Sequence, residues 1–144
     1  MAFYCLSVSN TALNTSNDTL TILSAASRRI LLHEVSGSGM GTVSAANELG
    51  VFKSTVGTTP GGSVTAAPIS VDMAAAAFTN ATTWSAQPTL GNNYLRLGIN
   101  ANGGVYRWVA KPGTEIQFRN AEQLSFRSVV GTSSVSFHCM VEEI

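Results

Sequence analysis

Apolar and polar residues alternate with a period of two along most of the chain. The segment Phe3–Ser9 follows this alternation, and in Ser134–Glu142 the side chains of Val135, Phe137 and Cys139 share one face. A period of two places successive side chains on opposite faces of an extended backbone, so it predicts half-buried β-strands.

The same pattern predicts ten short strands separated by turns rich in Gly, Asn and Pro. The expected strands are Phe3–Ser9, Asp18–Leu23, Arg29–Val35, Leu49–Val56, Val64–Val71, Tyr94–Ile99, Val105–Ala110, Glu115–Phe118, Leu124–Val130 and Ser134–Glu142. The glycines of Ser36–Gly39 are expected to end the third strand. Pro68 confines its strand to a sheet edge or a loop, because proline lacks the N–H that a ladder requires.

One segment favours a helix. Met73–Phe78 contains four consecutive alanines, the residue with the highest helix propensity. We therefore predict an all-β fold, a single-domain β-sandwich or jelly roll over residues 1–144, with about nine or ten short strands and one short helix.

Charge is sparse and balanced. Of 144 residues, 44% are hydrophobic and only 11% charged, and eight basic residues cancel eight acidic ones. Much of the polar surface is neutral, supplied by 17 Ser, 15 Thr and 10 Asn. A nucleic-acid binder that acts through bulk electrostatics needs clustered Lys and Arg, and so does a basic membrane-surface protein. Neither partner is expected, and no apolar run is long enough to span a bilayer.

Few charges also mean little cost of desolvation when surfaces meet. A folded chain of this mass exposes roughly 7,000 Å², and a standard interface covers about 800 Å² on each partner. We expect a homo-oligomer or a subunit of a larger assembly. A monomer with a Ser/Thr-rich surface is the alternative.

Reactive side chains form no catalytic pattern. The acids lie mostly at strand ends or turns, where solvated surface charge is usual, and Glu142 and Glu143 are expected to point to opposite faces. His33, His138 and Cys139 provide three metal ligands only if the third and last strands are neighbours, and the last two of these residues alternate in direction. We expect no enzyme activity, no cofactor and no metal site.

Two cysteines, Cys5 and Cys139, fall in the first and last expected strands. A disulfide is geometrically possible if those strands are adjacent, and two buried free thiols are the alternative. The segment Met1–Ser7 lacks the basic and long apolar regions of a secretory signal, so synthesis in the cytoplasm is expected.

Four aromatic residues are candidate interface residues: Trp84, Tyr94, Tyr106 and Trp108. Aromatic side chains with a polar group are common at interfaces and also fill cores. Tyr106 and Trp108 share a strand face, whereas Trp84 lies in the irregular stretch Asn80–Leu90.

Four segments carry a resemblance to a known family: Glu48–Thr55, Gly57–Gly62, Thr83–Leu90 and Arg107–Gly113. Together with the alanine run and the acidic C-terminal end, they resemble the small capsid decoration (cement) proteins of tailed bacteriophages. The resemblance implies a β-sandwich or jelly-roll subunit, often a homotrimer, on the outer surface of the virion head. It implies contacts that bridge neighbouring copies of the major capsid protein, and no functional residue is carried over. A phage tail or fibre subunit, or a carbohydrate-binding module using Trp84, Tyr94 or Trp108, is the alternative.

Overall fold

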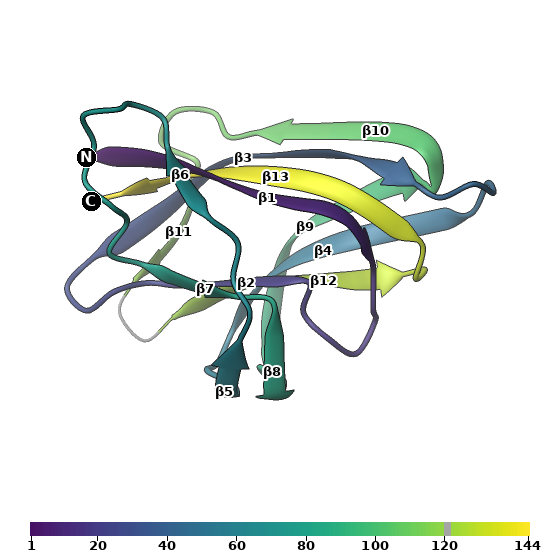
Figure 1. The fold of residues 1–144 in the computed structure, drawn as a ribbon, viewed down its shortest axis with the longest axis horizontal. Helices are drawn as coiled ribbons and strands as arrows, with labels where there is room; N and C mark the ends of the chain where they lie inside the picture. The colour runs from purple at the N-terminus through teal and green to yellow at the C-terminus, as the bar shows by residue number, and fades with distance from the viewer. Residues whose placement is uncertain (120–121) are drawn as a thin grey trace.

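A computed structural model of the chain describes residues 1–119 and 122–144. It contains thirteen β-strands, and two main antiparallel sheets pack as a sandwich (Figure 1). The all-β expectation is confirmed. The expected count of nine or ten strands is wrong, and so is the expected helix, because the described residues form none.

The first sheet, sheet A, has the strand order β10-β3-β13-β1-β6, and β11 pairs with the first part of β3. Its strands are β1 (Ala2–Ala12), β3 (Arg29–Met40), β6 (Ala66–Pro68), β10 (Asn102–Val109), β11 (Ile116–Arg119) and β13 (Ser134–Glu143). The short β6 lies at the sheet edge, as Pro68 predicts.

The second sheet, sheet B, has the order β7-β2-β12-β4-β9. Its strands are β2 (Leu20–Leu23), β4 (Ala46–Ser54), β7 (Thr79–Ala81), β9 (Leu90–Asn100) and β12 (Gln123–Val130). For comparison with other sandwiches, the eight principal strands are numbered one to eight in chain order; they are β1, β2, β3, β4, β9, β10, β12 and β13. In this numbering the strand order of sheet A is 6-3-8-1 and that of sheet B is 2-7-4-5.

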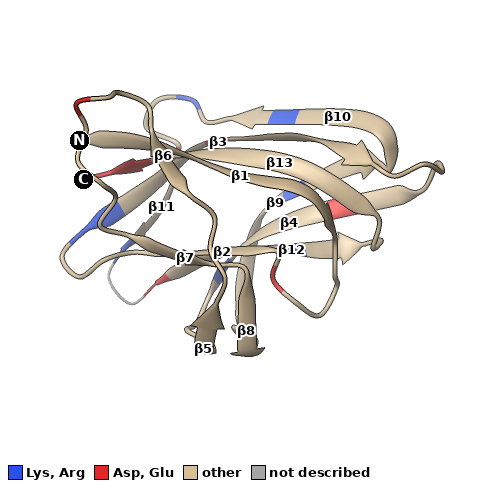
Figure 2. Cartoon of the chain, in the orientation of Figure 1, with Lys and Arg blue, Asp and Glu red and all other residues tan. Residues whose placement is uncertain are grey.

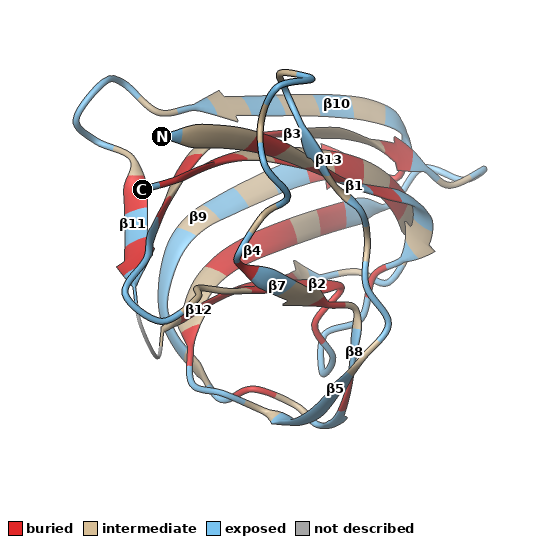
Figure 3. Cartoon of the chain, turned by 60° about the vertical axis from the view of Figure 1, so that its left-hand side comes forward, coloured by how far each residue is buried: buried red, intermediate tan, exposed pale blue. Residues whose placement is uncertain are grey.

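The core lies between the facing sides of the two sheets. In β13 the alternation is as predicted: Val135, Phe137 and Cys139 are buried, and His138 between them is partly exposed. Across the layers Phe137 stacks on Phe126 of β12, with ring centroids 5.4 Å apart. Figure 3 shows the burial as bands along the central strands, whereas β9 is mostly exposed.

The glycines of Ser36–Gly39 do not end β3, which continues to Met40. A Cβ atom at Gly39 would lie 2.2 Å from the carbonyl oxygen of Asn100. Glycine is used here because the β9–β10 turn approaches the backbone of β3 closely, a second role of glycine inside strands.

The alanine-rich segment Met73–Phe78 is irregular rather than helical. The backbone N–H groups of Ala77 and Phe78 donate to the carboxylate of Glu143, at 3.2 and 3.0 Å. The ring of Phe78 packs edge-on against Tyr4. A helix of six residues is marginal in water. These tertiary contacts outweigh the propensity of alanine.

A third, small sheet covers part of the outer face of sheet B. It pairs β5 (Thr58–Gly61) with β8 (Thr83–Ala86), in segments expected to be a turn and an irregular stretch. The indole Nε1 of Trp84 donates to Thr21 Oγ1 at 3.0 Å, and the Thr21 side chain is completely buried.

The buried carboxylate of Asp18 links several side chains beneath the β5–β8 sheet. Asp18 accepts hydrogen bonds from the hydroxyls of Thr21 and Ser125, and from Arg127 Nε at 2.6 Å. Its side chain is 0% exposed. The expectation that the acids are mostly solvated therefore fails at Asp18, and it fails again at Glu142 and Glu143, which are buried against the other end of the sandwich.

Candidate assembly surface

Charged residues are absent from one whole end of the molecule. Four segments, 7–17, 35–47, 97–106 and 128–137, contain no Asp, Glu, Lys, Arg or His. We call this surface the uncharged end. In Figure 2 the turns at this end are free of both charge colours, and both chain termini lie at the opposite end.

Strand pairing brings these four segments together. Val8 pairs with Phe137, and Met40 with Asn102. Beyond the strands, the N–H of Gly41 donates to the carbonyl of Ala101 at 2.7 Å. Segments up to about 130 residues apart in the chain thus form one continuous surface.

Local turn chemistry shapes this end. Gly131 has a positive φ of 81°, which only glycine adopts without strain. Its carbonyl accepts a hydrogen bond from Ser128 Oγ, and Ser133 N–H donates to Asn47 Oδ1. The turn between β12 and β13 is thereby held against the start of β4.

Several large apolar side chains are exposed here. Val105 is 80% exposed and Val43 is 72% exposed, and Met40 and Val130 are about half exposed. They come from three different turns or strand ends. Interface centres are typically depleted of charge and enriched in apolar area, and this end has both properties.

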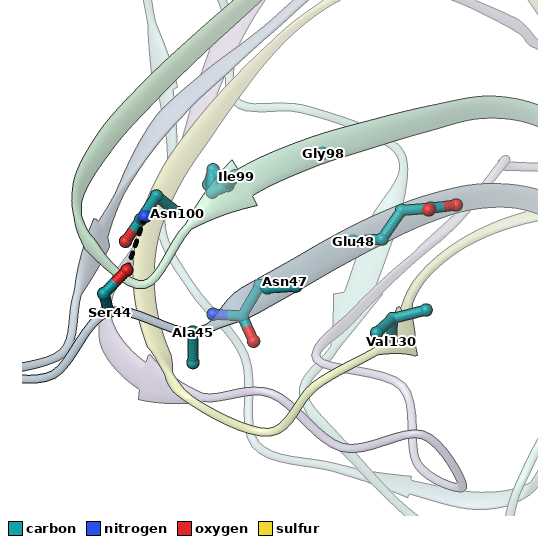
Figure 4. Close-up of a pocket in the computed structure, with 9 residues that line it drawn as sticks. Ser44, Ala45, Asn47, Glu48, Gly98, Ile99, Asn100 and Val130 are labelled. Carbon is teal, nitrogen blue, oxygen red and sulfur yellow. Dashed lines mark hydrogen bonds between the residues drawn. The ribbon is translucent and has the colours of Figure 1, made fainter.

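A groove of about 580 Å³ lies over the start of β4 and the paired end of β9. Its lining residues are Ser44, Ala45, Ala46, Asn47, Glu48, Gly98, Ile99, Asn100 and Val130. Figure 4 shows Asn100 Nδ2 hydrogen-bonded to Ser44 Oγ at one side, with Asn47 at the base. The Nδ2 atom of Asn47 is buried and has no hydrogen-bond partner among the described residues.

One cluster of charged and titratable side chains lies on neighbouring strands of sheet A. Arg107 donates two hydrogen bonds to Glu34, at 2.8 and 3.1 Å, and these hold the pKa of that carboxyl below its ordinary value. Ser36 Oγ lies 3.0 Å from Nε2 and 3.3 Å from Nδ1 of His138, and Glu34 Oε1 lies 3.7 Å from the same Nε2. In a nucleophile relay the hydroxyl bonds one ring nitrogen and the carboxylate bonds the other, whereas here the shorter contact of the Ser36 hydroxyl is to the nitrogen that Glu34 also approaches.

The three residues considered as metal ligands, His33, His138 and Cys139, do not converge. His33 bonds to Glu142 at 2.7 Å, whereas His138 lies several residues further along the ladder, opposite Ser36. Cys139 points into the core. Within residues 1–119 and 122–144 no group of three potential ligands converges.

Both thiols are free. Strands β1 and β13 are adjacent, but Cys139 pairs with Leu6, and Cys5 points to the other face of the sheet. Burial raises the pKa of each thiol above its ordinary value. The expected alternative of two free thiols is confirmed, with Cys139 buried and Cys5 partly buried.

The four candidate aromatic residues do not form one cluster. Trp84 is 8% exposed under the β5–β8 layer. Tyr106 and Trp108 do share a face of β10, as predicted, and both pack against the core. Burial raises the pKa of Tyr106. Tyr94 on β9 is 42% exposed, with Lys53 Nζ 5.7 Å from its ring centroid.

Sequence reasoning therefore missed the uncharged end, although it found the low total charge. The four charge-free stretches are visible in the sequence, but longer ones, 54–71 and 73–95, lie outside this end, so charge alone does not single it out. Recognising it required the strand pairing, because the stretches are far apart in sequence.

Comparison with family models, with curated proteins and with solved structures finds no significant match to this chain. Among the described residues, no helix is long and apolar enough to cross a membrane.

Proposed function

We propose that this chain is a structural assembly subunit that acts by binding protein surfaces, in the form of a decoration subunit on a tailed-phage head. The uncharged end carries the proposal. It offers exposed apolar side chains such as Val43 and Val105, with no charge that a partner must desolvate.

The strand order supports the jelly-roll form of the sandwich. Orders 6-3-8-1 and 2-7-4-5 make successive strands cross between the two sheets at most connections. Jelly rolls of eight strands in two sheets occur in viral capsid and lectin domains, so the topology agrees with a virion role.

The mechanism is stabilisation by mass action. A subunit that binds only the assembled lattice of major capsid proteins shifts the lattice away from dissociation. Linked copies raise the effective concentration of each contact, so single contacts can be weak. The resemblance implies a homotrimer on the virion surface.

Thermal release of the particle contents tests the proposal. Heads assembled without this chain are compared with the same heads after purified chain is added back. We expect the chain to bind the outside of the heads and to raise the temperature of release. Equal release temperatures at saturating chain contradict the proposal.

The alternative of a glycan-binding module depends on Trp84, Tyr94 and Trp108. Trp84 is buried and Trp108 is half-buried, so these residues form no common exposed platform. That alternative and a tail or fibre location remain predictions. Binding of the chain to glycans or to tails, and not to heads, would favour them.

A further inference from the structure

The free edge of β9 is the longest strand edge left open in the described part of the chain. β9 is the last strand of sheet B and spans 11 residues, whereas β6 and β7, which end the sheets on the other side, have three each. An open edge exposes backbone N–H and C=O groups that can pair with another strand.

Hydrogen bonding to β4 shows which backbone groups are free. Ala101 N–H donates to the carbonyl of Ala45 at 2.8 Å. In an antiparallel ladder such bonds recur at every second residue. The backbone N–H and C=O groups of Leu95 and Leu97 therefore point towards β4. The backbone groups of Arg96 and Gly98 point away from β4, to the open edge.

Natural edges are usually protected by charge, proline or bulges. The first half of β9 has register shifts around Tyr94, which interrupt its edge. The second half, Leu95–Asn100, is regular, contains no proline and carries one charge, Arg96, which is paired with Glu48 of β4. This half has no evident protection.

We propose that two copies of this chain pair antiparallel through this half of β9, about a two-fold axis at Leu97. Arg96 of one copy then faces Gly98 of the other, and four backbone hydrogen bonds form. The two sheets B become one continuous ten-stranded sheet. The inference rests on the self-association within the proposed function, and it favours a pair where the resemblance implies a trimer.

Charge complementarity supports a second copy as the occupant. Gly98 pairs with Glu48 across the β4–β9 ladder, and a Cβ at Gly98 would meet nothing within 4 Å. Because adjacent strands lie about 4.8 Å apart, Arg96 of the second copy reaches across Gly98 towards Glu48 of the first. By symmetry two such Arg–Glu contacts form, and a net charge of zero adds no long-range repulsion.

The area sets the expected strength. Six residues of strand extend about 20 Å, and the neighbouring edge of sheet A lies about 10 Å away. The contact therefore covers roughly 200 Å² on each copy, about a quarter of a standard interface. Pairing of isolated chains should be reversible and dependent on concentration.

Sedimentation equilibrium of the purified chain up to about 1 mM tests the pairing, since millimolar dissociation constants then become visible. We expect reversible growth from the chain mass of 15.0 kDa to twice that mass. Gly98→Lys places a cation opposite Arg96 and should weaken association at least tenfold. Asn92→Lys, on the same strand but in the part that the register shifts interrupt, is the matched control and should leave association unchanged.

A charge swap completes the test. Arg96→Glu should weaken pairing, and adding Glu48→Arg in the same chain should restore it, because the reciprocal contacts return with reversed sign. Circular dichroism checks that each variant folds. A chain that stays monomeric, a particle of three copies, or unchanged association of Gly98→Lys overturns the pairing.

Those results leave the proposed function separately testable. Binding of the chain to heads can succeed while β9 pairing fails. The reverse outcome, pairs in solution that leave release temperatures unchanged, rejects the decoration role alone.

Discussion

Asp18 and Arg127 form the most buried ion pair in the described structure. Their side chains are 0% and 11% exposed, and Asp18 also accepts hydrogen bonds from two buried hydroxyls. Arg127 further donates to the carbonyl of Pro88, in the segment that follows β8. The pair therefore ties sheet B to the covering β5–β8 layer.

Removing one charge of this pair leaves the other buried without compensation. Asp18→Asn should lower the free energy of unfolding by about 3–5 kcal/mol. Arg96→Ala breaks an exposed pair with Glu48 and is the control, with an expected loss below about 1 kcal/mol. Urea unfolding at low chain concentration measures both. Equal losses in the two variants would show that burial does not govern the Asp18 pair.

Individual residues show where sequence reasoning succeeds and where it fails. The burial of Val135, Phe137 and Cys139 was predictable because alternate side chains of a strand point to opposite faces of the sheet, so the local polarity pattern indicates which face is buried. The buried state of Asp18 and Glu143 was not, since their partners are a distant arginine and distant backbone N–H groups.

Two glycines within strands, Gly39 and Gly98, have opposite surroundings. Gly39 in β3 faces the backbone of the β9–β10 turn, whereas Gly98 in β9 faces open space. The two glycines look alike in sequence, and only the neighbouring strand distinguishes them. For that reason the end of β3 was predicted too early.

Alanine substitutions separate these roles. Gly39→Ala forces a Cβ to 2.2 Å from a carbonyl oxygen and should destabilise the fold by about 1–3 kcal/mol. Gly98→Ala should be neutral or stabilising by up to about 1 kcal/mol, because alanine loses less chain entropy on folding. Thermal unfolding followed by circular dichroism compares them. A neutral Gly39→Ala would mean that the close approach relaxes at little cost.

At the level of elements, most long strands could be predicted and the short ones could not. β5, β7 and β8 have three or four residues each, too few for a periodic pattern to show. The segment Met73–Phe78 illustrates the complementary failure. Its helix propensity is local, whereas Glu143 and Tyr4, which fix its backbone and bury Phe78, lie at the two ends of the chain.

The whole molecule is divided into a charged part and an uncharged end. The composition shows that charge is sparse, and from this we predicted association, but it does not show where the uncharged surface lies. The position of that surface depends on which turns come together, and this follows from the way the chain crosses between the two sheets. The division is the feature on which the proposed function depends.

Lysine substitutions inside and outside the uncharged end measure the role of that end in binding. Val43 and Val105 are exposed at the uncharged end, and Val71, 98% exposed, lies on the loop that follows β6, outside the four charge-free segments. Each replacement adds the same charge at a largely exposed side chain. Circular dichroism checks that each variant folds, so that the remaining differences report binding.

Co-sedimentation of these variants with heads assembled without the chain is the most direct test of assembly through the uncharged end. Val43→Lys and Val105→Lys should each reduce the bound fraction at least tenfold in apparent affinity, and Val71→Lys should bind like the unmodified chain. Full binding of both uncharged-end variants, or loss confined to Val71→Lys, would contradict the account.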